Sequence, residues 1–342
     1  MLQEKDVIKI REELDNCSNP LFLFDDDPDG LASFLLLYRY KGAGYWSFIK
    51  ASAELGEEYL NKVFESRTDK IFVLDKPIVS QDFIDNAKVP IVWIDHHPPV
   101  ERDNVKYFNP RKYDYNDYSS TSRICYEVVK QDLWIAMTGI TGDWQLTELA
   151  EEFHNKYPEL YPDNIKRPED ALFGTKTGKL VRIFSFILKG KTSEIKKCIK
   201  HLIAIKSPYE ILEKKTKEGK YVYERFEKVE KEYNKLLKEA KECASKDKVL
   251  LYAYTELHTS FTSDLSNELL YLYPDKFVIV CRQKSGEMRC SLRYSNARIQ
   301  PILDKAFNAG VKGYGGGHDH AVGANIKEED FERFLEVIRE SI

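Results

Sequence analysis

The sequence predicts an α/β protein with two domains, a larger one built on a parallel sheet and a smaller α/β one, joined by a helical connector. Short apolar runs alternate with helical segments in the N-terminal third of the chain. Such alternation is typical of a parallel sheet with helices on both faces. A charged segment with helical periodicity follows at 206–245, and strand and helix patterns alternate again over 246–342. We therefore expect domains at 1–205 and 246–342.

The composition is that of an ordinary globular chain. Of its 342 residues, 42% are hydrophobic and 13% aromatic, which is ample for real cores. No apolar run approaches the roughly 20 residues that span a bilayer, and the N-terminus lacks a signal-peptide pattern. We therefore expect a cytoplasmic protein with no membrane partner. The 52 basic and 56 acidic residues nearly balance, which excludes a globally basic nucleic-acid binder and leaves only a local patch for nucleic acid.

The six cysteines are scattered, with no Cys-x-x-Cys pair. This pattern argues against zinc and predicts ordinary buried thiols in a reducing compartment.

The first domain is expected to open with a helix at 6–16 and a strand at 21–24. A short, continuous apolar run of this kind is typical of a strand buried on both faces. A helix follows Gly30, and the unit recurs with strands at 45–49, 71–74 and 91–94 and helices at 54–66 and 80–87. Ser119 to Ser122 would cap a helix at 123–130. Further helices are expected at 133–140, 179–188 and 192–205, while 145–175 fits no pattern.

Apolar residues spaced three and four apart between 221 and 240 predict an amphipathic connector helix with a solvated charged face. The second domain is expected to hold strands at 249–254, 277–281 and 287–293 and helices at 263–273, 299–309 and 328–342. Before the last helix stands Gly315-Gly316-Gly317-His318. Glycine permits close backbone approach, so successive N–H groups can form an anion site there, with His318 as a further donor. The alternative is a flexible turn.

Acidic residues follow three of the predicted strands. Asp25, Asp27 and Asp29 follow the first, Asp75 another, and Asp95-His96-His97 the strand at 91–94. Because parallel strands end at the same edge of a sheet, these side chains should converge. Their mutual repulsion favours a bound cation, although a solvated acidic turn is the plain alternative.

A calcium loop also begins Asp-x-Asp-x-Asp-Gly, and Asp25 to Gly30 match that start. We reject it because the twelfth position, which should be a bidentate Glu, is Leu36, and because a strand precedes the motif.

Together these motifs and a later Gly142-Asp143 follow one order along nearly the whole chain. In this the sequence resembles the DHH phosphoesterases that carry a DHHA1 domain. The resemblance implies that one metal ion is held by Asp25, Asp27 and Asp75, and a second by Asp29, Asp75, His96 and Asp143, with Asp75 bridging. It also implies that His97 faces the scissile phosphate. The residues that it implies for substrate binding are Ser291, Arg293, Gly315, Gly316, Gly317 and His318.

The chemistry of the residues agrees with this resemblance. Carboxylates and imidazole without thiolate suit manganese or magnesium. Two such ions can activate water and neutralise the leaving oxygen of a phosphodiester. We therefore expect two Mn²⁺ ions, or Mg²⁺ in their place, with Asp75 and His97 at the reacting centre.

The sequence departs from many relatives at Asp25, where they have His. Asp25 stands two residues before Asp27, as in the RecJ-like branch, whereas relatives that cleave cyclic dinucleotides or very short RNA have His at the position of Leu23. The spacing favours an exonuclease or phosphodiesterase acting on single-stranded DNA or RNA. A hydrolase of dinucleotides or cyclic dinucleotides is the alternative, and a non-catalytic replication-fork scaffold is a third. The expected partner is a single strand or short oligonucleotide, while a homodimer or a replication or repair partner stays open.

Overall fold

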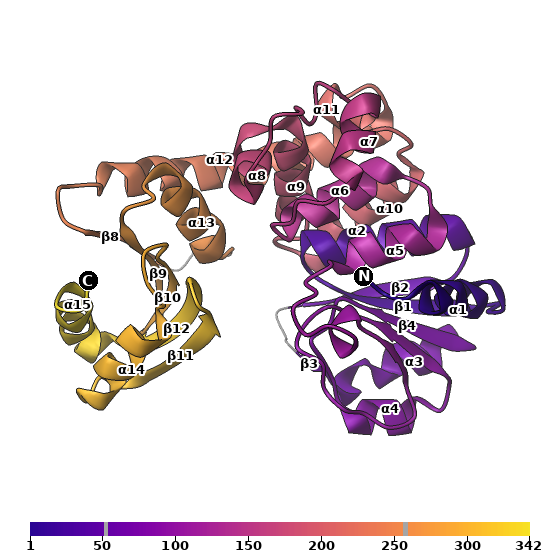
Figure 1. Cartoon of the computed structure of the whole chain (residues 1–342), viewed down its shortest axis with the longest axis horizontal. Helices are drawn as coiled ribbons and strands as arrows, with labels where there is room; N and C mark the ends of the chain where they lie inside the picture. The colour runs from indigo at the N-terminus through magenta and orange to yellow at the C-terminus, as the bar shows by residue number, and fades with distance from the viewer. Residues whose placement is uncertain (51–53, 256–258) are drawn as a thin grey trace. The chain divides into compact units, whose positions relative to one another are not determined.

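The computed structural model describes residues 1–50, 54–255 and 259–342. The chain divides into two compact units, Met1–Phe226 and Glu227–Ile342 (Figure 1). Among the described residues, no helix is both long enough and apolar enough to cross a membrane.

The first unit is built on a parallel sheet with the strand order β2-β1-β4-β6-β7. Its strands are β1 (Pro20–Asp25), β2 (Tyr45–Ile49), β4 (Lys70–Leu74), β6 (Ile91–Ile94) and β7 (Lys106–Phe108). Leu74 lies opposite Phe24 on one side and Ile94 on the other. The three central strands therefore end in step, and the residues that follow these three come to one edge of the sheet.

Helices cover both faces of this sheet (Figure 1). On one side lie α1 (Glu4–Asp15), α2 (Pro28–Lys41), α5 (Thr121–Val129), α6 (Leu133–Gly142), α9 (Lys176–Ile187) and α10 (Thr192–Ala204), and on the other α3 (Leu60–Ser66) and α4 (Gln81–Ala87). Aromatic packing joins the first side to the strands, because the ring centroids of Phe24 and Phe34 are 4.4 Å apart and those of Phe22 and Phe72 are 5.3 Å apart. The predicted alternation of strands and helices is thus confirmed.

The remaining elements of this unit correct the sequence-based assignment in two places. The predicted helix at 54–66 begins instead as β3 (Glu54–Leu55), because Leu55 pairs with Val79 of β5 (Ile78–Val79) before the chain turns into α3. The unassigned stretch 145–175 contains α7 (Leu149–Lys156) and α8 (Pro168–Gly174). The other short elements are η1 (Glu57–Tyr59), η2 (Pro110–Lys112) and α11 (Pro208–Leu212).

The boundary between the units falls within α12 (Lys217–Glu242), which is the amphipathic helix predicted for this region. The second unit has a mixed sheet with the order β11-β12-β10-β9-β8, in which only β8 and β9 run parallel. Its strands are β8 (Val249–Thr255), β9 (Phe277–Lys284), β10 (Glu287–Arg293), β11 (Gly313–His318) and β12 (Ala321–Lys327). Its helical elements are α13 (Thr262–Leu272), α14 (Gln300–Asn308), η3 (Glu328–Asp330) and α15 (Phe331–Arg339). One face of this sheet packs on α14 and α15 to form the core of the unit.

The glycine-rich segment forms an edge strand, β11, and not the flexible turn that was the alternative to an anion site. Close packing against β12 explains why glycine is needed. A Cβ added at Gly315 would lie 2.9 Å from the Cβ of Ala324, and one at Gly317 would lie 2.5 Å from the carbonyl oxygen of Ala321. Because such approaches exclude a side chain, the glycines permit the strand to pair closely.

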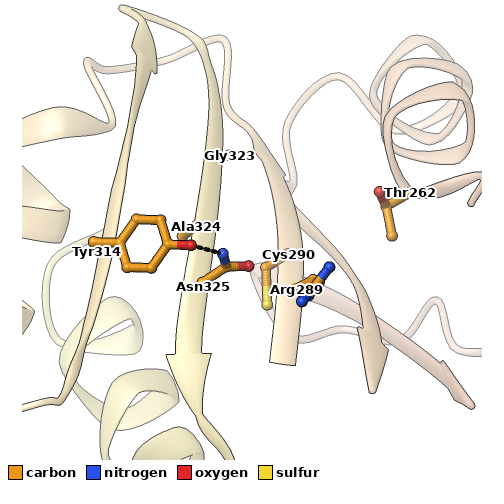
Figure 2. A pocket seen from close by; sticks show the side chains of 7 residues that line it. All are labelled: Thr262, Arg289, Cys290, Tyr314, Gly323, Ala324 and Asn325. Carbon is orange, nitrogen blue, oxygen red and sulfur yellow. Dashed lines mark hydrogen bonds between the residues drawn. The ribbon is translucent and has the colours of Figure 1, made fainter. Parts of the chain in front are cut away.

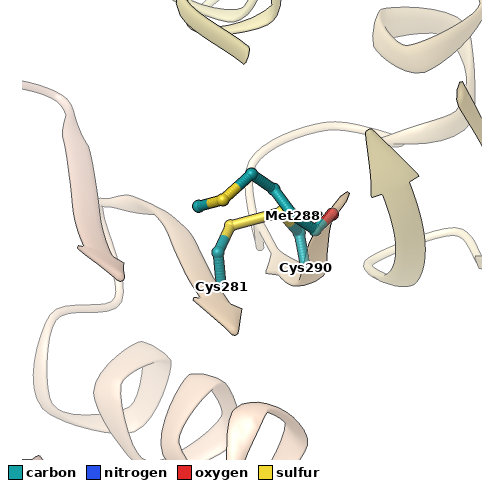
Figure 3. The surroundings of a disulfide bond; sticks show 3 residues. All are labelled: Cys281, Met288 and Cys290. Carbon is teal, nitrogen blue, oxygen red and sulfur yellow. Dashed lines mark hydrogen bonds between the residues drawn. A yellow bond between two sulfur atoms is a disulfide. The ribbon is translucent and has the colours of Figure 1, made fainter. Parts of the chain in front are cut away.

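The prediction of ordinary buried thiols was wrong for three of the six cysteines. Cys281 and Cys290 lie directly opposite each other on β9 and β10, with Cα atoms 4.1 Å apart, and form a disulfide (Figure 3). Residues that face each other across an antiparallel pair come this close, and their spacing in sequence does not reveal it. Cys17, Cys125 and Cys198 are buried free thiols as predicted, whereas Cys243 is exposed.

Candidate active site

The acidic residues singled out in the first domain gather at the carboxyl edge of the parallel sheet. Asp25 ends β1, while Asp75 and Asp95 directly follow β4 and β6. Asp27 is the N-cap of α2, where its side chain accepts a hydrogen bond from the backbone N–H of Gly30 at 2.8 Å. Asp29 lies in the first turn of the same helix. The predicted convergence of carboxylates at this edge is therefore present.

His96 lies between two of these carboxylates. Its Nε2 is 3.5 Å from Oδ1 of Asp75, and its Nδ1 is 3.7 Å from Oδ2 of Asp143, the C-cap residue of α6. Nδ1 is buried and, within the described part of the chain, has no hydrogen-bond partner. Burial lowers the pKa of His96 below its ordinary value. The ring is therefore neutral near pH 7, which is the form that ligates a metal.

Two groups of side chains in the described residues could hold a metal ion. One consists of Asp75, His96 and His97, and the other of Asp29, His96 and Asp143; in each, the ligand atoms lie within 4.8 Å of one another. Over residues 1–50, 54–255 and 259–342, neither group includes Asp25 or Asp27. Oxygen ligands with an unpartnered imidazole nitrogen fit a divalent cation such as Mn²⁺ or Mg²⁺.

The carboxylates of the cluster are crowded; Asp29 and Asp75 are buried, Asp25 and Asp143 are partly exposed, and Asp27 is exposed. Burial and the charge of Asp29 raise the pKa values of Asp75 and Asp143 well above their usual range. Desolvation among these neighbouring groups and the charges of Asp25 and Asp29 likewise raise the pKa of Asp27 to about 7. Each direction reflects negative charges held close together.

Helix α5 fixes two of these carboxylates through its N-terminal turn. The backbone N–H groups of Thr121 and Ser122 donate to the two oxygens of Asp29 at 2.8 and 3.0 Å. The hydroxyl of Thr121 donates to Oδ1 of Asp75 at 2.9 Å. A helix N-terminus presents free N–H groups and favours negative charge, so α5 positions both carboxyl groups at the sheet edge. On the far side of His96, Gln145 donates to Oδ2 of Asp143 at 2.7 Å.

Asp95 orients His97 rather than joining the cluster. It lies 2.8 Å from Nδ1 of His97 and accepts the backbone N–H of the same residue at 3.1 Å. The Tyr107 hydroxyl and the Asn109 amide donate to Oδ2 of Asp95 at 3.2 and 3.3 Å. Because Oδ1 of Asp95 accepts from Nδ1–H, Nε2 of His97 is the nitrogen left for a ligand. Burial by itself lowers the pKa of His97, but the hydrogen bond and charge of Asp95 outweigh it, and the pKa lies above its ordinary value.

For the phosphodiester hydrolysis that the motifs predict, we expect Asp95→Asn to lower kcat about tenfold, because carboxylates that orient a functional histidine typically contribute tenfold or more. Asparagine keeps the size of the side chain but loses the charge that holds Nδ1–H. The Mn²⁺ content and KM should stay unchanged. Tyr107→Phe, which removes only one donor to Asp95, is the matched control and should cost less than about threefold. Equal losses in the two variants would show that Asp95 does not position His97.

Sequence reasoning missed several of these partners. Thr121 was predicted only as part of a helix cap, Gln145 lies in the stretch that fitted no pattern, and Asn109 was given no role. Lys76 was not considered at all, although it is fully buried with its Nζ 2.9 Å from Oδ1 of Asp25. The available signal was a charged residue directly after Asp75 and before Pro77, since a lysine beside a buried acid usually needs a partner.

In the second unit, four of the six predicted substrate residues share one face of the mixed sheet. On the two sides of β12, Ser291 and Gly316 both lie opposite Gly323. Arg293 and His318 both lie opposite Ala321 in the same way. Residues directly opposite each other point to the same side. Gly315 and Gly317 belong to the other face by the same alternation, so they do not line this surface together with Gly316.

Arg293 is fixed within its own unit. Its guanidinium donates to Oδ1 of Asn267 at 2.5 Å and to the hydroxyl of Ser263 at 3.0 Å, both on α13. Burial lowers the pKa of Arg293 to about 10, so the group still carries its charge near pH 7.

A pocket of about 220 Å³ opens along this sheet. Figure 2 shows Tyr314 pointing toward Asn325, whose side-chain amide donates to the Tyr314 hydroxyl, with Arg289 on the next strand. The row of Tyr314, Asn325 and Arg289 runs across three neighbouring strands. It adds an aromatic ring and a cation beside the predicted substrate residues.

The fold and the site define an α/β protein with candidate metal ligands at the carboxyl edge of a parallel sheet and a polar sheet face in a second domain. The family comparison is more specific. The DHH family, N-terminal domain, matches residues 22–152, and the DHHA1 domain matches residues 247–342. The chain therefore carries a DHH domain followed by a DHHA1 domain, which confirms the family indicated by the motifs. No curated protein matches the sequence.

Solved structures share this fold at low sequence identity. RecJ from Thermus thermophilus in complex with Mn²⁺ has a TM-score of 0.65 and 14% identity, over 100% of this chain and 55% of that chain. An exonuclease RecJ bound to manganese has a TM-score of 0.62 and 13% identity, over 100% of this chain and 94% of that chain. The pGpG-specific phosphodiesterase PggH from Vibrio cholerae has a TM-score of 0.54 and 16% identity, over 95% of this chain and 98% of that chain. This chain thus spans 55% of the length of the Thermus protein.

Proposed function

We propose that the protein is a metal-dependent phosphodiesterase that hydrolyses single-stranded DNA or RNA at the cluster around His96. The observation that carries this proposal is the buried, unpartnered Nδ1 of His96, with Asp75 and Asp143 on either side of the ring at 3.5 and 3.7 Å. A buried polar nitrogen without a partner is costly, and a ligated cation removes that cost.

A divalent ion would be held on one side of the His96 ring, either by Asp29, His96 and Asp143 or by Asp75, His96 and His97. Manganese is our first choice, because the donors are oxygens and imidazole and two similar folds are described with Mn²⁺. Magnesium is the alternative, since another RecJ structure is described with Mg²⁺. A bound ion would supply an activated water and neutralise charge on the phosphodiester. A second ion on Asp25, Asp27 and Asp75 stays a prediction from the family resemblance.

The chain's own residues would complete the chemistry. Thr121 and Gln145 hold Asp75 and Asp143 in place through hydrogen bonds of 2.9 and 2.7 Å. His97, held by Asp95, would present Nε2 toward the phosphate and carry a proton there. Ser291, Arg293, Gly316 and His318 would bind phosphates of the substrate, contacts that position a nucleic acid without reading its bases.

A hydrolase of dinucleotides or cyclic dinucleotides is the second candidate. The observation that favours it is the shared fold with a pGpG-specific phosphodiesterase, which covers 98% of that chain. A short substrate needs few contacts, and the pocket beside Tyr314 is of a size to take one base. The scaffold alternative is disfavoured, because the acids and histidines expected of a catalytic site are all present at the sheet edge.

The experiment that tests the proposal compares three substrates at equal Mn²⁺. An end-labelled single strand, pGpG and a cyclic dinucleotide are incubated with the full chain, and mononucleotide release is followed. We expect successive release of mononucleotides from the strand, with kcat/KM above that for pGpG. Preference for pGpG would favour the second candidate, and no hydrolysis of any of the three would overturn the phosphodiesterase.

His318→Ala is expected to lower kcat/KM on single strands about ten- to a hundredfold, since one charge-assisted phosphate contact contributes about 1.5–3 kcal/mol. DNA and RNA should be affected alike and Mn²⁺ content should not change. The matched control is His320→Ala in the same hairpin, because His320 is already bonded through Nδ1 to the carbonyl of Tyr294 at 2.9 Å. Kinetics of His318→Ala within about twofold of wild type would remove the substrate role of this sheet face.

A further inference from the structure

Lys76 is a buried cation inside the acidic cluster. It follows Asp75 directly at the end of β4 and has no exposed surface. Burying an ammonium group is very costly unless a negative charge and hydrogen bonds compensate for it. Its Nζ lies 2.9 Å from Oδ1 of Asp25, so a carboxylate that the family resemblance assigns to a metal ion is already neutralised by the protein itself.

The backbone around Lys76 is held in this position. The indole N–H of the buried Trp93 donates to the carbonyl oxygen of Lys76 at 2.9 Å. One residue earlier, the N–H of Asp75 donates to the carbonyl of Ile94 at 2.9 Å. Both bonds tie the end of β4 to β6. The pairing of Lys76 with Asp25 is therefore part of the packed sheet edge and not a chance contact of a surface side chain.

The positions of the candidate metal ligands agree with the pairing of Asp25 with Lys76. The two groups that could hold an ion are Asp75, His96 and His97, and Asp29, His96 and Asp143. Both need His96, and because a neutral imidazole has one nitrogen free to ligate, only one of the two groups can be occupied at a time. Asp25 and Asp27 belong to neither group among the described residues. A cation fixed on Asp25 also repels a further divalent ion that would bind the same carboxylate.

We propose that the Lys76 ammonium group takes the place of the metal ion that the family resemblance puts on Asp25, so that the site binds a single divalent ion at His96. The proposal rests on the proposed function and specifies its cofactor. A fixed ammonium group donates hydrogen bonds and neutralises a carboxylate, but it does not activate water. The chain would therefore work with one exchangeable ion, while Lys76 supplies a positive charge beside Asp25.

The first test counts Mn²⁺ ions on the wild-type chain by equilibrium dialysis and elemental analysis, followed by electron paramagnetic resonance. We expect one ion per chain with the spectrum of an isolated Mn²⁺. Two ions per chain with a spin-coupled spectrum, in an enzyme that still hydrolyses phosphodiesters, would overturn this proposal alone. No bound Mn²⁺ and no hydrolysis would overturn the proposed function as well.

The second test removes the ammonium group. Lys76→Met keeps an unbranched buried side chain and leaves Asp25 unneutralised, so we expect the variant to bind a second Mn²⁺. The matched control is Lys70→Met at the other end of the same strand, where the amine pairs with Glu13 at 2.8 Å, and it should bind one ion. A Lys76→Met chain that folds and still binds one ion would overturn the proposal.

A double variant tests the proposal even if the Lys76→Met chain does not fold. Asp25→Asn with Lys76→Met replaces the ion pair by two neutral groups, so neither buried charge is left without its partner. If Lys76 stands in for an ion on Asp25, this chain binds one Mn²⁺ with a Kd within about twofold of the wild-type value. A loss of more than about tenfold in Mn²⁺ affinity would identify Asp25 as a ligand and contradict the proposal.

Discussion

Asp75→Asn is expected to lower kcat/KM for phosphodiester hydrolysis by about a thousandfold or more, because a metal ion at such a site contributes several kcal/mol of charge stabilisation. Asp75 is 1% exposed and faces His96, and Thr121 donates to the same oxygen, Oδ1. Replacing the carboxylate by an amide removes an anionic ligand while keeping the shape of the side chain. The expected measurement is turnover of a labelled single strand at saturating Mn²⁺.

Asparagine is the substitution to use because of the backbone at this residue. Asp75 has a φ of 60°, a left-handed conformation that asparagine tolerates better than alanine does. Asp75→Ala would add backbone strain to the loss of a ligand. Asp82→Asn, an exposed acid in the first turn of α4, is the control and should keep wild-type activity. More than about a tenth of wild-type turnover by Asp75→Asn would show that Asp75 is not required at the reacting centre.

The convergence of acidic residues at the sheet edge could be predicted from the sequence, because each step of the prediction depends on residues that are close together in the sequence. The apolar runs before Asp25, Asp75 and Asp95 identify buried strands, and the alternation with helices makes them parallel. Parallel pairing then brings their ends together whatever the detailed register. The observed register, with Leu74 opposite Phe24 and Ile94, adds only that the ends of these strands are aligned to within one residue.

The partners of these acids could not be predicted, because they come from distant parts of the chain. Lys76 and Asp25 are 51 residues apart, and Thr121 and Asp29 are 92 apart. No periodicity links such pairs, and each exists only because two elements pack at the same edge. The secondary structure of the glycine-rich segment could not be predicted for another reason. Its composition permits a loop or a strand, and pairing with β12 decides in favour of the strand.

Chelation of the metal should abolish hydrolysis while leaving the fold intact. The core of the first unit is made of apolar side chains such as Phe22, Phe24, Phe34 and Phe72, which pack between the sheet and α2. Dialysis against EDTA should therefore leave the far-ultraviolet circular dichroism spectrum unchanged. Adding Mn²⁺ back should restore turnover fully, since nothing in the sheet has to refold.

The cluster itself explains why it can stay folded without an ion. The N–H groups of Thr121 and Ser122 hold Asp29, and Lys76 neutralises Asp25. The loss of free energy of unfolding should be about 3 kcal/mol when the ion is removed from a hundredfold excess over its Kd. A thermal melt of the chelated and Mn²⁺-loaded chains measures this difference. Collapse of the helical and strand signals on chelation would make the ion structural, because a catalytic ion at a sheet edge that packs without it leaves both signals in place.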